Sequence, residues 1–80
     1  MSAATALVVA VLTDGTRVTE TIHAAPGYRN VYKEGLQQFG ASLIGANGKR
    51  PELAALVMIE GVYVYDYTGN EALEILGWEG

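Results

Sequence analysis

The sequence predicts an α+β domain in which a four-stranded antiparallel sheet carries one long helix on one face and a short helix at the C-terminus. Two apolar segments each contain a turn signal, Asp14-Gly15 in the first and Glu60-Gly61 in the second, and so predict two β-hairpins. Between them, from Tyr28, the apolar spacing changes from two to three or four residues, as it does in a helix. The predicted order is β-β-α-β-β-α, in a single domain over residues 1–80.

The first hairpin is predicted from Thr5 to His23. With Asp14 and Gly15 as a two-residue loop, Leu7 pairs with Ile22. The first strand is apolar on both sides, which is typical of a central strand, and the second is half polar, which is typical of an edge strand. A crossover through the helix that places the third strand beside the first gives the strand order 2-1-3-4.

The second hairpin is predicted from Leu53 to Tyr67. With Glu60 and Gly61 as the loop residues, Ile59 pairs with Val62. Mainly valine and isoleucine then fall on one face, and leucine, methionine and tyrosine on the other. Both faces are apolar, so the sheet needs a cover on each side.

The long helix is predicted from Tyr28 to Ile44, and its apolar face consists of Tyr28, Val31, Tyr32, Leu36, Phe39 and Leu43. Gly35 and Gly40 lie inside it, where each lowers the helix propensity by about 1 kcal/mol relative to alanine. These glycines indicate either a close approach to the sheet or to a second helix, or simple tolerance.

The predicted helix ends are set by capping residues. Ala46-Asn47-Gly48 is a stop signal for the long helix, and Asn70 is the expected N-cap of a short helix that continues to Leu76. We expect the long helix to cover the sheet face that carries Leu7, Val9 and Val57.

The opposite sheet face is then the expected interface. The short helix is under two turns long and shelters little of it, so we expect a protein partner there, and a second copy of the chain is the simplest partner. The competing account is that the C-terminal tail with Trp78 folds back across this face. The interface residues predicted on this face are Val8, Leu12, Leu56, Met58, Tyr63, Tyr65 and Tyr67.

Composition narrows the classes of partner. Half of the residues are hydrophobic, 18% are charged, and no cysteine is present to form a disulfide or a thiolate zinc site. The net charge of −4, with only five Lys and Arg, argues against a nucleic-acid partner. The apolar segments are too short for a bilayer and no basic region precedes the first one, so we expect no membrane partner and a cytoplasmic location.

Few residues of the sequence are candidates for catalysis or for ligand binding. His23 is the only histidine, and no Ser-His-Asp pattern accompanies it, so no catalytic residue and no cofactor are predicted. The alternative is a ligand site formed by His23, by Tyr28 and Arg29 near the start of the long helix, and by the sheet tyrosines.

An oxygen-rich group near the C-terminus contains residue types that bind metal ions. Asp66, Asn70, Glu71 and Glu74 surround Gly69, but their spacing is not that of an EF-hand, and capping with a solvated acidic first turn explains the same residues. No metal site is therefore predicted.

These observations favour a non-enzymatic protein-binding or regulatory module that acts as a homodimer. Such a module would be a subunit of a larger assembly, an accessory factor, or an inhibitor of the kind that viruses and mobile elements encode. The alternative is a small-molecule-binding protein or minor enzyme with a site near His23, Arg29 and the tyrosines.

Overall fold

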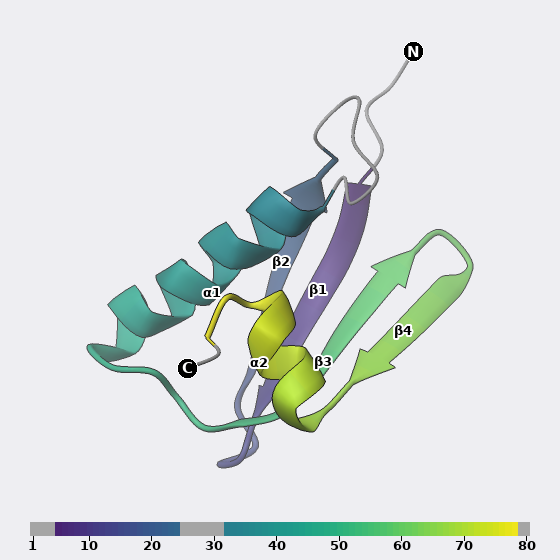
Figure 1. The fold of residues 1–80 in the computed structure, drawn as a ribbon. Helices are drawn as coiled ribbons and strands as arrows, with labels where there is room; N and C mark the ends of the chain where they lie inside the picture. Colours follow the sequence, from purple (N-terminus) through teal and green to yellow (C-terminus); the bar gives the residue numbers. More distant parts are fainter. Residues whose placement is uncertain (1–4, 25–31, 79–80) are drawn as a thin grey trace.

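The computed structural model describes residues 5–24 and 32–78 and confirms the predicted fold (Figure 1). The predicted helix start at Tyr28 lies outside the described residues. The sheet is antiparallel and has the predicted order β2-β1-β3-β4. In chain order, the elements are β1 (Thr5–Leu12), β2 (Arg17–His23), α1 (Lys33–Asn47), β3 (Leu53–Glu60), β4 (Tyr63–Tyr67) and α2 (Gly69–Ile75).

The first hairpin is closed by the pair Leu12 and Thr16, so its loop has three residues, 13–15, and not the predicted two. The Leu12 N–H donates to the Thr16 carbonyl oxygen at 2.8 Å, and the Thr16 N–H donates to Asp14 Oδ1 at 2.9 Å. Gly15 has φ +90°, the left-handed conformation that a three-residue hairpin loop requires at that position. The added residue places Ile22 opposite Ala6 instead of Leu7, and so moves it to the other face of the sheet.

The loop between β3 and β4 is one residue later than predicted. It consists of Gly61 and Val62, and Gly61 has φ +60°, as the first loop residue of a type II′ turn does. The strand register therefore pairs Glu60 with Tyr63. This shift leaves every strand residue on its predicted face, because each β3 residue moves by two positions along β4.

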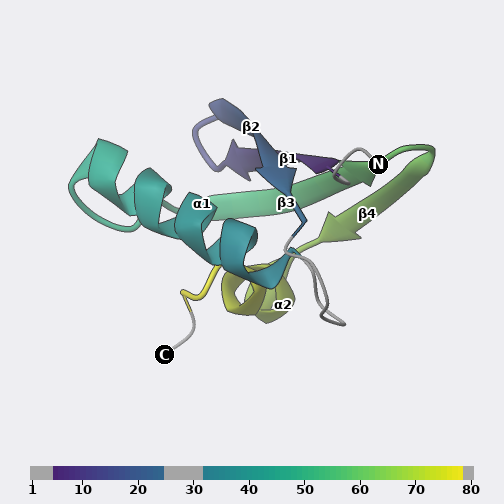
Figure 2. The ribbon, with the colours of Figure 1, turned by 90° about the horizontal axis from the view of Figure 1, so that it is seen from above.

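Both helices lie on the same side of the sheet (Figure 2). The core beneath them contains Ala6, Val8, Ala10, Leu12, Ile22 and Leu56 from the strands, together with Leu36, Phe39 and Leu43 from α1. The prediction that α1 covers the face with Leu7, Val9 and Val57 is therefore wrong. Helix α2 covers the same face as α1 and not the opposite one.

The register of the first hairpin explains which face the helices cover. Ile22 lies opposite Ala6 and Val18 opposite Ala10, so the apolar residues of β2 share a face with Val8. The opposite face receives only polar residues from β2. The apolar residues of three strands therefore gather on the covered face.

Two helix glycines mark close contacts. A Cβ on Gly35 would overlap the Ile22 side chain of β2, and one on Gly40 would overlap the carbonyl oxygen of Leu76 at the end of α2. The interpretation of Gly35 and Gly40 as close-approach positions is confirmed. Gly48, with φ +75°, ends α1 at the predicted stop.

The C-terminal tail folds back under α1. Trp78 is 4% exposed, and its carbonyl oxygen accepts a hydrogen bond from an Arg50 guanidinium N–H. Trp78 belongs to the same buried cluster as Val8 and Leu56, so the tail helps to cover this face, as the competing account expects. The N-cap of α2 is Thr68, so the expectation of Asn70 as the cap is wrong; Asn70 lies in the first turn.

Candidate functional site

The sheet face away from the helices is an uncovered aliphatic surface, which we call the open face. Directly opposed residues of antiparallel strands share a face, and the pairs Leu7–Ile59, Val9–Val57 and Ile59–Val64 place these side chains on the same side. The apolar residues of the open face are Leu7, Val9, Val11, Ala55, Val57, Ile59 and Val64. None of the described residues forms a layer over it (Figure 2).

Exposure on the open face follows the position of each strand. Val9 and Val57 on the central strands are half-buried by their neighbours. Leu7 is 38% exposed and Val64, on the edge strand β4, is 63% exposed. A contiguous aliphatic patch of this kind on a small chain is typical of an interaction surface.

The two edges of the open face carry opposite charges. The β2 edge presents Arg17 and His23, with Thr19 and Thr21 between them. The β4 edge presents Asp66, which lies opposite Val57. These polar residues form the rim that an aliphatic interface needs at its solvent boundary.

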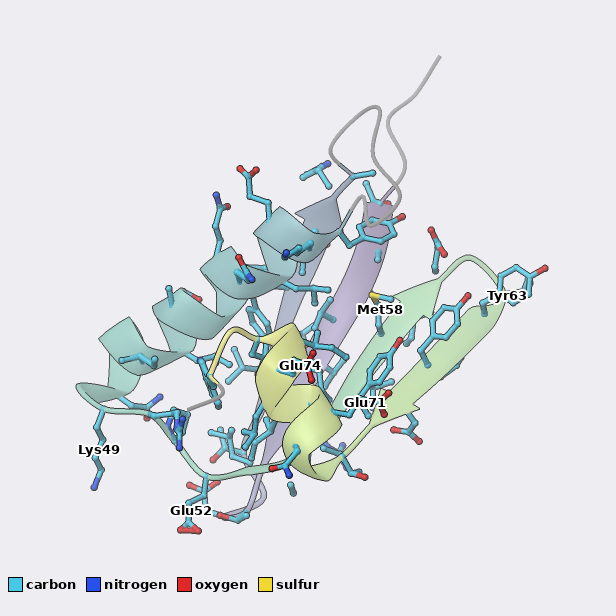
Figure 3. All side chains as sticks on the ribbon, viewed as in Figure 1. Lys49, Glu52, Met58, Tyr63, Glu71 and Glu74 are labelled. Atoms are coloured by element: carbon cyan, nitrogen blue, oxygen red, sulfur yellow. The ribbon has the colours of Figure 1, made fainter. Side chains whose placement is uncertain are left out.

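A second candidate site is a cleft on the helix side, which we call the tyrosine cleft. It has a volume of about 510 Å³ and lies between the start of α1 and α2, above β3 and β4. Figure 3 shows Glu71 and Glu74 on the side of α2 toward β4, with Met58 on β3 nearby. The residues that line it are Tyr32, Lys33, Leu36, Gln37, Met58, Tyr67, Glu71, Glu74 and Ile75.

Hydrogen bonding and burial keep the two tyrosines of this cleft protonated. The Tyr32 hydroxyl donates to Glu60 Oε2 at 2.6 Å, and this bond, with burial and the Glu60 charge, raises the pKa of Tyr32 to about 12. Burial, followed by the charge of Glu71, raises the pKa of Tyr67. Both phenols are therefore neutral at physiological pH.

The predicted interface residues divide into three groups. Val8, Leu12 and Leu56 are buried beneath the chain's own helices, and Met58 and Tyr67 are half-buried and line the tyrosine cleft. Tyr63 and Tyr65 are exposed, at 63% and 38%. The buried members are not available on the surface of the chain, because α1 and α2 cover this face.

The described residues of the predicted ligand site, His23 and the sheet tyrosines, do not come together. His23 is exposed on the open face of β2, whereas Tyr63, Tyr65 and Tyr67 lie on the helix face of β4, at the far edge of the sheet. Tyr28 and Arg29, the other predicted members, lie outside the described residues.

Sequence reasoning missed part of the tyrosine cleft. The sequence pattern indicates Tyr32 and Leu36 only as core residues of the helix, and it indicates no site for Lys33 and Gln37. It indicates Glu71 and Glu74 only as capping or metal-ligating residues. The spacing of Glu71 and Glu74, three residues apart on a helix, was the one signal that they share a face.

Two further properties bear on the site. Across residues 5–24 and 32–78, no three His, Cys, Asp or Glu side chains gather closely enough to hold a metal ion. Neither described helix is long and apolar enough to cross a membrane.

Comparison with protein-family models, with curated protein sequences and with solved structures finds no match to this chain.

Proposed function

We propose that this protein is a non-enzymatic interaction module that forms a homodimer through the open face. The uncovered aliphatic surface formed by Leu7, Val9, Val57, Ile59 and Val64 is the observation that carries the proposal. Burying the remaining exposed part of each large side chain contributes on the order of 1 kcal/mol. The sequence also predicts a homodimer, but through the sheet face that carries Val8 and Leu56 and not through the open face.

A second copy of the chain can pack on the open face as one β-sheet packs on another. Two twisted sheets stack with their strands within about 30° of each other and about 10 Å apart. The result is a four-layer particle, with the helices outside and the two aliphatic faces inside. A twofold axis makes one surface serve both partners, which suits a chain whose open face is apolar at its centre and carries Arg17 at one edge and Asp66 at the other.

The rim charges favour one orientation of the pair. A twofold axis parallel to the strands places β2 of one copy over β4 of the other, so that Arg17 faces the partner's Asp66. The strand pairing puts Asp66 and Thr19 at the same height along the strands, on opposite edges of the sheet. Arg17 is two residues, about 7 Å, farther along β2 than Thr19. An axis perpendicular to the strands, in the plane of the sheets, would instead place β2 over β2 and β4 over β4, so that the Arg17 edges meet each other and the Asp66 edges meet each other.

The experiment compares two lysine substitutions by light scattering at matched concentrations. Val57→Lys places a charge at the centre of the open face, whereas Val62→Lys places the same charge in the hairpin loop, where Val62 is 89% exposed. We expect the parent and Val62→Lys to have the mass of two chains, and Val57→Lys to have the mass of one.

A further variant separates loss of association from loss of folding. Val9→Thr with Val57→Thr keeps the β-branched shape that strands favour and removes apolar surface. We expect this variant to be a folded, less stable monomer, whereas the thermal midpoint of the parent rises with protein concentration. A parent that is monomeric at high micromolar concentration, with a midpoint independent of concentration, contradicts the proposal.

A further inference from the structure

The tyrosine cleft has the size of a small-molecule site. Its volume of about 510 Å³ lies within the range of about 300–1,000 Å³ typical of ligand pockets. Leu36, Met58 and Ile75 give it apolar walls, and the rings of Tyr32 and Tyr67 add aromatic surface. It lies on the opposite side of the sheet from the open face, so it does not depend on the proposed dimer.

The charges around this cleft select the class of ligand. Glu71 and Glu74 line it from α2 and are solvent-exposed, and Lys33 is the one cation among the lining residues. Glu60, which accepts the Tyr32 hydrogen bond, adds a third carboxylate beside it. The net charge of these four groups is −2, and the raised pKa of Tyr67 has the Glu71 charge among its causes.

We infer that the tyrosine cleft binds a small organic amine, with the ammonium group at Glu71 and Glu74 and the apolar body against Met58 and the two tyrosines. Carboxylates form charge-assisted hydrogen bonds with ammonium groups, and aromatic faces attract cations. An anion would be repelled by two carboxylates on the α2 wall, and a neutral ligand would gain no ion pair from them. The apolar walls distinguish such an amine from an inorganic cation.

The test uses phenylbutylamine and its neutral analogue phenylbutanol as probes, with binding followed by NMR shifts of the Met58 methyl group and the Ile75 amide. We expect the amine to bind about fivefold more tightly than the alcohol, because two exposed carboxylates each add a modest ion-pair term. Both probes carry the same apolar body, so the difference between their dissociation constants isolates the contribution of the charge.

Three variants locate that charge effect. Glu71→Gln with Glu74→Gln should abolish the preference for the amine, and Lys33→Gln should tighten amine binding. Glu52→Gln is the matched control, because Glu52 is an exposed carboxylate far from the cleft (Figure 3), and it should leave both affinities unchanged.

The inference is overturned by any of three results: equal binding of the amine and the alcohol, an unchanged preference in the double glutamine variant, or amine-induced shifts that map to Val9 and Val57 instead of the cleft. Since all of the substituted side chains are exposed, loss of folding is not expected to obscure the comparison.

Discussion

The indole Nε1–H of Trp78 donates a hydrogen bond of 3.1 Å to the carbonyl oxygen of Gly40, at the point where α1 meets the end of α2. The contact is buried and joins residues 38 positions apart in the chain. It requires a glycine, because a Cβ at position 40 would lie 2.9 Å from the same indole nitrogen and would overlap the Leu76 carbonyl oxygen. This contact fixes α2 against α1, and so sets one wall of the tyrosine cleft.

Gly40→Ala should therefore lower the free energy of unfolding by about 2–3 kcal/mol, through overpacking at the helix contact. Gly45→Ala is the matched control, because it is in the same helix and a Cβ there meets nothing within 4 Å. The control should stabilise the protein by up to about 1 kcal/mol. Denaturant unfolding followed by the fluorescence of Trp78, the only tryptophan, measures both values. Equal effects of the two substitutions would contradict the close contact.

Tyr32→Phe tests the hydrogen bond to Glu60. Its removal should cost about 1 kcal/mol at neutral pH, a modest value because Glu60 is partly exposed to solvent. The folded-state pKa of Tyr32, about 12, exceeds the ordinary tyrosine pKa of 10.0, so the hydrogen bond contributes its full stability below pH 10 and loses it as the pH rises toward 12.

The difference in unfolding free energy between the parent and Tyr32→Phe should consequently shrink over that alkaline interval. Unfolding curves collected at several pH values between 8 and 12 check this, with Tyr63→Phe as the control, since Tyr63 is 63% exposed. A difference that stays constant across the interval would show that Tyr32 ionises as an ordinary tyrosine.

Charge substitution tests the orientation of the proposed pair. Arg17→Asp or Asp66→Arg alone should weaken self-association about threefold to tenfold, because each places like charges at both rim contacts. Mixing the two variants in equal amounts should restore association, since opposite charges then meet at each contact. Sedimentation equilibrium at low salt measures all three samples. If the mixture associates no better than either variant alone, β2 does not lie over β4 of the partner.

The sequence was sufficient for the topology because the topology depends on local signals. Turn residues, the change of apolar period and the contrast between apolar and half-polar strands all act over a few residues, and each agrees with the observed order. The close approaches at Gly35 and Gly40 were also indicated by the low helix propensity of glycine at those positions.

The covered face was assigned wrongly because it depends on one residue of loop length. An Asp-Gly pair fits a two-residue loop as well as it fits the observed three-residue loop, and the difference moves Ile22 to the other face. The tyrosine cleft was not predicted because Tyr32 and Lys33 meet Glu71 and Glu74 only through the packing of α1 against α2, which no local pattern specifies.

The most direct test of the open-face dimer is an isotope-filtered NOE measurement on a mixture of labelled and unlabelled chains, which detects only contacts between different copies. We predict intermolecular NOEs among the methyl groups of Val9, Val57 and Ile59, and none to the methyl groups of Val8 or Leu56, which are fully buried within each chain. Intermolecular NOEs that map to Tyr63 and Tyr65, or their absence at millimolar concentration, would contradict the account.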